Sequence, residues 1–211
     1  MAKLELKKII PDFRDNPKLE GVYYKDGCEY ASDGHWMYKI CEYYAKENEG
    51  KFIRPNGKEV TYLHFNEDTQ KYDEYETKVE PPAYDKVLDR FKIERSQYEL
   101  ADLILKDDFE NIYKHFTHYK NKTLFENHSI IIYIGSDHNY IGMNLYTLKA
   151  VLLFWRAYPK ARLYANKEDD KKPFFLTDGA NTCVFVTVNP DWYNGFSWTY
   201  STKDETVKKI A

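Results

Sequence analysis

Three Asp-Gly or Asn-Gly dipeptides, each flanked by short runs of β-forming residues, constrain this chain more than any other feature. They are Asp26-Gly27, Asn56-Gly57 and Asp178-Gly179. Such dipeptides favour the tight turns of β-hairpins, because those turns require residues that tolerate positive φ. Around the first of them, apolar and polar residues alternate, as in a strand buried on one face. The sequence therefore predicts three hairpins and antiparallel sheets.

Two segments have helical periodicity. In the first, Ser96 begins a capping box and apolar residues follow at three- or four-residue spacing as far as Phe116. This pattern predicts one long helix, or two short ones with a break at Asp107-Asp108. The second segment begins after Asn144, a favourable N-cap, and ends before Pro159. Strands and helices in both halves of the chain predict an α+β fold.

The length of 211 residues allows one large domain or two small ones. The acidic, tyrosine-rich stretch 66–82 lacks a consistent apolar face and ends in two prolines, which favours a linker or an edge loop. We accordingly predict two similar halves that meet near Arg90. The expected division is 1–90, 91–200 and a polar C-terminal tail at 201–211.

Charge is unevenly distributed along the chain. The total of 31 Lys and Arg against 34 Asp and Glu gives a net charge of -3, which excludes a uniformly basic nucleic-acid binder. Residues 67–80 hold six acids and two lysines, a net charge of −4, whereas residues 138–167 hold five basic residues and no acid, a net charge of +5. A local basic patch therefore remains compatible with the acidic total.

The cysteines are Cys28, Cys41 and Cys183, an odd number without CxxC spacing. This pattern predicts reduced, structural thiols rather than a disulfide framework or a zinc site. The N-terminus carries charges where a signal peptide has its apolar core, and no apolar run is long enough to span a membrane. We therefore expect a cytoplasmic protein without a membrane partner.

The histidines and the paired acids offer weak candidates for a catalytic or metal site. No two histidines have HxH or HExxH spacing, and His115 and His118 have no acidic ligand in register. The pairs Asp33-His35 and Asp137-His138 lie in turn contexts, where aspartate serves the backbone. Neither a nucleophile motif nor a phosphate-binding glycine loop occurs, so we expect no catalytic residue, no metal and no cofactor. The histidines are His35, His64, His115, His118, His128 and His138.

A basic stripe runs along the second predicted helix, which is otherwise apolar. It comprises Lys149, Arg156 and Lys160. Lysines on the edge of a buried helix ordinarily form its solvated border, with their stems covering apolar surface. The stripe alone therefore does not identify a function.

Two longer segments resemble DNA polymerase processivity clamps (sliding clamps), of the bacterial β type in motif detail. The segment 16–40 is similar to the family's Pro-x-Leu-x-Gly-Val strand followed by a strand ending in Ala-Thr-Asp-Gly-His, with Ser32 in place of the threonine. The segment 140–190 resembles the closing pattern of the family, with Met143 in place of a phenylalanine, and 81–91 resembles its Tyr-Pro-x-Tyr segment. The residues that match are Pro17, Leu19, Gly21, Val22, Ala31, Asp33, Gly34, His35, Gly142, Asn144, Leu148, Leu152, Leu163, Pro173 and Val186.

The resemblance implies a clamp-like α+β fold, and a non-enzymatic processivity or tethering factor that contacts duplex DNA through phosphates without reading its sequence. Bacterial clamps have three domains in each chain, whereas this chain has room for two at most. The implied partners are duplex DNA, a DNA polymerase or other replication protein, and further copies of the chain, although a monomer is equally compatible. The DNA-contacting residues expected are Lys149, Arg156, Lys160, Lys114 and Lys120.

Two other functions remain open. The first alternative is a clamp-fold module that binds a protein partner and does not touch DNA. An enzyme that uses the Asp33-His35 or Asp137-His138 pair ranks last.

Overall fold

The computed structural model describes most of the chain, and its backbone contacts divide it into two compact units. Unit 1 is formed mainly by 94–179 and 183–211, and unit 2 by 3–93 and 180–182. The described residues are 4–10, 16–41, 46–93, 98–100, 106–118, 130–136, 139–166, 172–187 and 196–210.

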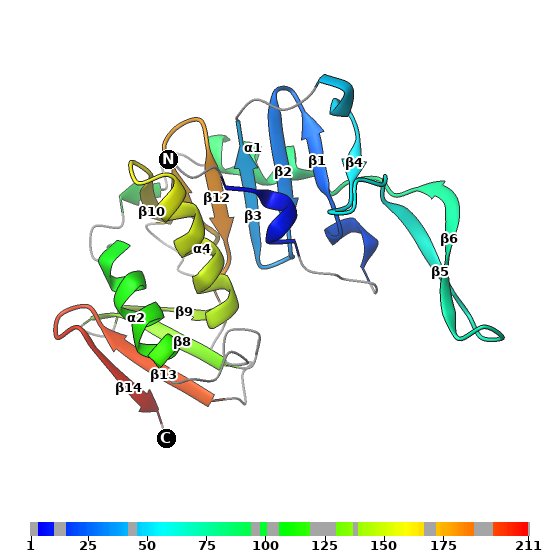
Figure 1. The fold of residues 1–211 in the computed structure, drawn as a ribbon. Helices are drawn as coiled ribbons and strands as arrows, with labels where there is room; N and C mark the ends of the chain where they lie inside the picture. The colour runs from blue at the N-terminus through cyan, green and yellow to red at the C-terminus, as the bar shows by residue number, and fades with distance from the viewer. Residues whose placement is uncertain are drawn as a thin grey trace. The chain divides into compact units, whose positions relative to one another are not determined.

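Four strands of unit 2 lie in the order β4-β1-β2-β3 (Figure 1). The predicted hairpin at Asp26-Gly27 joins β1 to β2, and both turn residues have positive φ, 52° and 74°. Side chains that alternate toward one face, such as Val22 and Tyr24 of β1, are buried. The strands are β1 (Val22–Lys25), β2 (Cys28–Ser32), β3 (Trp36–Ile40) and β4 (Phe52–Ile53).

The other two predicted turns are also present. At Asn56-Gly57 the chain reverses, the Arg54 N–H donates to the Lys58 carbonyl (2.8 Å), and Gly57 has a φ of 87°. Asp178-Gly179 lies between β11 (Phe174–Thr177) and β12 (Thr182–Phe185), which are neighbours in a sheet. All three hairpin predictions are therefore confirmed.

The prediction of reduced thiols is wrong for two of the three cysteines. Cys28 and Cys41 form a disulfide, and the buried Cys183 keeps its thiol. The cause is the register of β2 against β3, in which Glu29 lies opposite Ile40, so the next residue outward on each strand is a cysteine. The expectation of a cytoplasmic location therefore loses its support from the cysteines.

The predicted linker at 66–82 is instead largely a β-strand. β5 (Thr61–Asn66) and β6 (Lys71–Lys78) form an antiparallel ribbon that extends away from β1–β4 in Figure 1. We call this ribbon, residues 61–78, the arm. Its β-forming tyrosines and threonines outweigh the high charge that favoured an irregular segment.

Helix α1 (Tyr84–Ile93) follows the arm and packs on the sheet of unit 2. The Tyr84 ring stacks on Tyr30, with ring centroids 5.5 Å apart, and Asp85 forms an ion pair with Lys25 of β1. Together these contacts attach the helix to the first hairpin.

Unit 1 contains the strand order β12-β11-β10-β7. In it, β7 (Tyr98–Leu100) pairs with β10 (Arg162–Asn166). The helix predicted to begin at Ser96 would have included the residues of β7. That prediction is wrong for β7, because pairing with β10 overrides the capping pattern. Helix α2 (Lys106–His118) begins at the expected break near Asp107-Asp108.

A second sheet of unit 1 has the order β14-β13-β8-β9. It is mixed, because β13 pairs with β8 in parallel while the other pairs are antiparallel. The predicted polar tail at 201–211 is wrong, since β14 lies within it. Apart from the one parallel pair, the α+β fold with antiparallel sheets is confirmed. The strands are β8 (Ile130–Ser136), β9 (Asn139–Asn144), β13 (Phe196–Ser201) and β14 (Thr206–Ile210).

Short 3₁₀ turns also occur in the described part of unit 2. No helix in the described residues is long and apolar enough to cross a membrane. The 3₁₀ turns are Leu6–Lys8, Pro17–Leu19 and Lys46–Asn48.

The Asp33-Gly34 turn between β2 and β3 is built as a backbone-serving motif. Asp33 Oδ1 accepts from the N–H groups of His35 (2.7 Å) and Trp36 (2.8 Å), and the Gly34 N–H donates to Ser32 Oγ (3.0 Å). Gly34 has a φ of 91°, a conformation that residues with a Cβ rarely adopt. The aspartate therefore orders the turn, as the sequence indicated.

Gly34→Val is expected to lower the free energy of unfolding by about 2 kcal/mol, because a β-branched residue is strained at positive φ. Urea unfolding measures the loss. Gly34→Asn is the matched control and should cost less, since asparagine tolerates positive φ better. Equal stability of the valine variant and the wild type would contradict the strain argument.

Candidate nucleic-acid interface

The predicted basic helix is present as α4 (Leu145–Ala157). The Asn144 side chain caps it by accepting from the Thr147 N–H at 2.6 Å, as its N-cap position predicted. The helix ends at Ala157, and its C-cap Tyr158 lies immediately before Pro159, which cannot continue the hydrogen-bond ladder. Both predicted boundaries are confirmed.

Helix α4 is nearly all apolar because most of its circumference is covered. It contacts β8, β9 and α2 within unit 1 (Figure 1). Phe109 of α2 meets Trp155 of α4 edge to face, with ring centroids 5.6 Å apart, and Trp155 Nε1 donates to the Ala161 carbonyl at 3.1 Å. Leu148, Val151 and other buried side chains fill the remaining contacts. The charged residues of α4 are thereby confined to one edge.

The structure places the predicted DNA-contacting residues in different surroundings. Lys160, in the turn after α4, and Lys114, on α2, are exposed, whereas Lys149 is half-buried. Within the described part of the chain, neither Lys149 nor Lys160 forms an ion pair. Lys120 lies outside the described residues.

Arg156 differs from the lysines because its charge is already matched. Its Nε and Nη2 atoms donate to both carboxylate oxygens of Glu110 on α2, at 2.8 and 2.6 Å. The guanidinium also lies over the Tyr113 ring, 4.9 Å from its centroid. Glu110 and Tyr113 therefore already hold the guanidinium. Fewer of its N–H groups are available to a DNA phosphate than in a solvated arginine.

The ion pair changes the acid–base behaviour of Glu110. The hydrogen bonds from Arg156 hold the pKa of the Glu110 carboxyl below its ordinary value. Because the pKa is lowered in the folded state, the pair stabilises the fold above the ordinary glutamate pKa of about 4.3. That contribution is lost as the pH falls through the lowered value.

Arg156→Ala is expected to lower the free energy of unfolding at pH 7 by about 1–2 kcal/mol, from the lost ion pair, ring contact and stem packing. Thermal unfolding at pH 7 and again below the Glu110 pKa checks the claim. The difference between variant and wild type should shrink in acid, because the protonated carboxyl no longer attracts the arginine.

Lys160→Ala is the matched control, since its side chain is exposed at the same edge, and it should stay within about 0.5 kcal/mol of the wild type. The sequence alone places Arg156 with the two lysines on the solvated border of the helix. Equal melting of Arg156→Ala and Lys160→Ala would restore that earlier interpretation.

The candidates for acid–base chemistry gain no support from the geometry. Asp33 is buried and bonded to the backbone of its turn, while His35 beside it is exposed. His138 and Asp137 lie outside the described residues, as does His128. Among the residues that the structure describes, no three His, Cys, Asp or Glu side chains gather as a metal site.

Sequence reasoning missed Glu110 and Tyr113 as partners of the basic helix. Glu110 is 46 residues from Arg156, so no local spacing connects them. The signal that existed was the acidic start of α2, in which Asp107, Asp108 and Glu110 lie between Lys106 and Lys114. Only the packing of α2 on α4 brings these groups together.

Comparison with known proteins gives little further guidance. No protein-family model matches the chain, and no curated protein sequence matches it. One crystal structure is similar, described as a "Putative DNA polymerase III beta subunit" from Eubacterium rectale, at 14% sequence identity and a TM-score of 0.47. The similarity covers 87% of this chain and 62% of that one. The fold class given above depends on the strand pairing of this chain.

Proposed function

We propose that the protein is a non-enzymatic tethering or processivity factor that contacts duplex DNA through the edge of α4. The observation that supports this proposal is a helix that is buried except at one edge, where Lys149 and Lys160 lie. These two lysines form no ion pair in the described residues. Lysines of this kind contact phosphates without reading bases, which permits sliding. The clamp-like motifs of 16–40 and 140–190 favour the same role.

Salt dependence tests the proposal. Lys149→Ala with Lys160→Ala should reduce the slope of log affinity against log salt by about 1.8 for duplex DNA, or about 0.9 for each lost phosphate contact. The effect should not depend on the base sequence. Because the hold of a clamp on DNA depends on encirclement, the assay uses circular duplex at high protein concentration.

The matched control removes two exposed lysines of unit 2, Lys51 and Lys86, and should leave the slope unchanged. Arg156→Ala should lower the slope by less than the roughly 0.9 expected for one lost phosphate contact, because Glu110 already binds the guanidinium. Equal slopes for the wild type and the Lys149/Lys160 variant would reject the DNA role of α4.

A second candidate is a protein-interaction module that does not bind DNA. The Arg156–Glu110 pair favours it, since one of the three charges of the basic stripe is neutralised from within. Equal salt slopes for the wild type and the Lys149/Lys160 variant would leave this candidate as the preferred function.

A further inference from the structure

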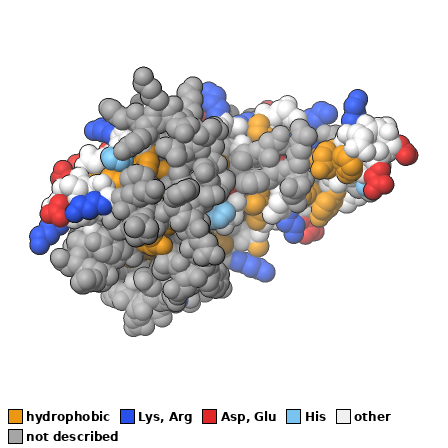
Figure 2. Space-filling view, turned by 90° about the horizontal axis from the view of Figure 1, so that it is seen from below, with side chains coloured by type: hydrophobic (Ala, Val, Ile, Leu, Met, Phe, Trp, Pro, Cys, Tyr) orange, Lys and Arg blue, Asp and Glu red, His pale blue; other side chains and the backbone are white. Residues whose placement is uncertain are grey.

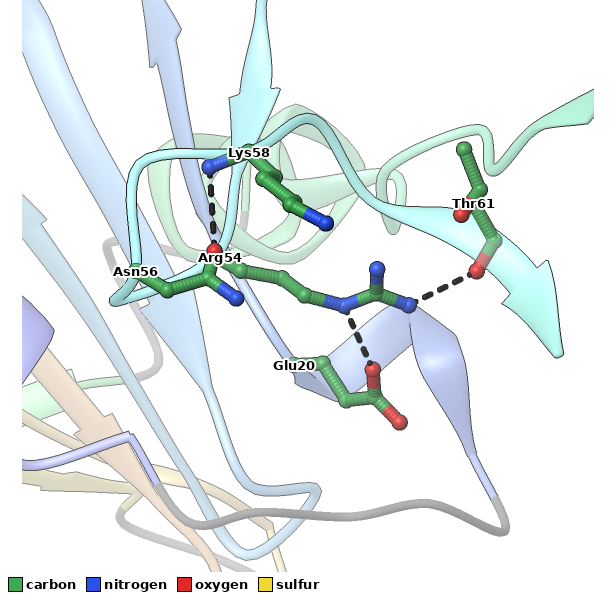
Figure 3. Close-up of polar contacts among 5 residues, drawn as sticks. All are labelled: Glu20, Arg54, Asn56, Lys58 and Thr61. Atoms are coloured by element: carbon green, nitrogen blue, oxygen red, sulfur yellow. Dashed lines mark hydrogen bonds and ion pairs between the residues drawn. The ribbon is translucent and has the colours of Figure 1, made fainter. Parts of the chain in front are cut away.

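The arm is fixed to unit 2 by a buried polar contact and a small apolar cluster. Arg54 Nε donates to Glu20 Oε2 at 3.0 Å, and its Nη2 donates to the carbonyl of Thr61, the first residue of β5, at 2.9 Å (Figure 3). The Glu20 and Arg54 side chains are only 5% and 10% exposed. Arg54 therefore connects the body of the unit directly to the start of the arm.

Apolar packing reinforces this attachment from both strands of the arm. Val60 precedes β5, Val79 follows β6, and both are buried against Phe52 of β4. The Val60 N–H donates to the Phe52 carbonyl, and the Val79 N–H donates to the Val60 carbonyl, each at 2.9 Å. The base of the arm is thereby held in one orientation.

Side-chain hydrogen bonds also hold the tip of the arm. Asn66 Oδ1 accepts from the N–H groups of Asp68 (3.0 Å) and Thr69 (3.1 Å), and Asn66 Nδ2 donates to Asp73 (2.9 Å). Gln70 adopts positive φ to close the turn. A structured tip and a fixed base distinguish the arm from an irregular surface loop.

Large hydrophobic side chains are exposed along this ordered ribbon. Among the described residues four large hydrophobic side chains are exposed, and three lie in the arm: Tyr62 (40%), Phe65 (40%) and Tyr72 (41%). Phe65 lies opposite Tyr72 in the register, with ring centroids 5.2 Å apart. Exposed aromatic side chains that lie together on a regular element are characteristic of protein interfaces.

Charge and hydrogen bonding indicate what such an interface accepts. Residues 67–80 carry a net charge of −4, and Figure 2 shows hydrophobic side chains beside acidic ones at the right-hand end, where the arm lies. The arm is a two-stranded sheet in the described part of the chain, so each strand has one edge without a neighbouring strand. Such edges accept an added strand.

We propose that the arm binds an extended, basic and apolar segment of a partner protein by strand addition. In this arrangement apolar side chains of the segment cover Phe65 and Tyr72, while its lysines or arginines face acids such as Glu67 and Asp73. The acidic charge of the arm disfavours nucleic acid at this surface. The proposal is independent of whether α4 contacts DNA.

The test uses a fluorescent synthetic peptide in which lysine alternates with valine and phenylalanine, and a second peptide with glutamate in place of lysine. The full-length protein should bind the lysine peptide and not the glutamate peptide. Phe65→Ser with Tyr72→Ser should weaken binding at least about tenfold, as expected for aromatic residues central to an interface. Glu67→Lys with Asp68→Lys should weaken it too, and added salt should do the same.

Val87→Ser is the matched control, because Val87 is the fourth exposed hydrophobic side chain and lies outside the arm, in α1. It should bind the peptide like the wild type. Hydrogen exchange should show new protection at the amides of β5 or β6 on peptide binding, and the melting temperature of each variant verifies that it folds.

Several results would overturn the proposal. They are equal affinity of the serine double variant and Val87→Ser, equal affinity for both peptides, or no binding at about 1 mM peptide. A dimer of the peptide-free protein that the Phe65/Tyr72 variant abolishes would instead assign the arm to a second copy of the chain. Sedimentation over a range of protein concentrations detects this last outcome.

Discussion

Arg54→Leu is expected to lower the free energy of unfolding by about 3–5 kcal/mol, the largest effect of any single substitution considered for this protein. The variant removes the ion-pair partner of Glu20, whose side chain is 5% exposed, and a buried carboxylate without its counter-charge is costly. It also removes the donor to the Thr61 carbonyl at the base of the arm. Urea unfolding gives the total loss.

The matched control is the double variant Arg54→Leu with Glu20→Leu, which removes both charges together. It should recover much of the lost stability, because replacing a buried pair by apolar residues is often close to neutral. If the single and double variants are equally unstable, the loss comes from the Thr61 contact or from packing rather than from the charge.

The same substitution distinguishes the fold of unit 2 from the order of the arm. With Arg54 replaced, the Thr61 carbonyl loses a hydrogen bond while the Val60–Phe52 and Val79–Val60 backbone bonds remain. Amide exchange in β5 and β6 should therefore accelerate more than in β1 and β2. Uniform acceleration would show that the ion pair serves the whole unit.

Local signals in the sequence predicted the parts of the fold that local chemistry determines. The turns at Asp26-Gly27, Asn56-Gly57 and Asp178-Gly179 follow from the tolerance of these residues for positive φ. The limits of α4 follow from one capping asparagine, Asn144, and one proline, Pro159. None of these inferences requires knowledge of distant contacts.

Most of the errors occurred where distant contacts decide the structure. β7 became a strand because β10, more than 60 residues later, pairs with it despite the capping pattern at Ser96. The stretch 66–82, which contains β6 of the arm, resembles a linker or an edge loop in sequence because its charge masks its β propensity. The parallel pairing of β13 with β8 likewise leaves no periodic trace in a single sequence.

The candidate interface was predicted only in part for the same reason. The spacing of Lys149, Arg156 and Lys160 correctly indicated one polar edge on a buried helix. It did not indicate that Glu110 neutralises Arg156, since that contact depends on how α2 packs against α4. A charge pattern along one helix therefore predicts where charges lie but not which of them are available to a ligand.

Reduction of the Cys28–Cys41 disulfide is expected to lower the free energy of unfolding by about 3 kcal/mol. The bond closes a loop with a sequence separation of 13 residues, and opening it increases the chain entropy of the unfolded state by about that amount. The measurement is urea unfolding with and without dithiothreitol.

Cys28→Ala with Cys41→Ala is the control and should be insensitive to the reductant, whereas Cys183→Ala should keep the sensitivity of the wild type. A wild-type protein with the same stability in both conditions, and with two alkylatable thiols more than the structure shows, would mean that the pair is reduced and that the original interpretation of the cysteines was right.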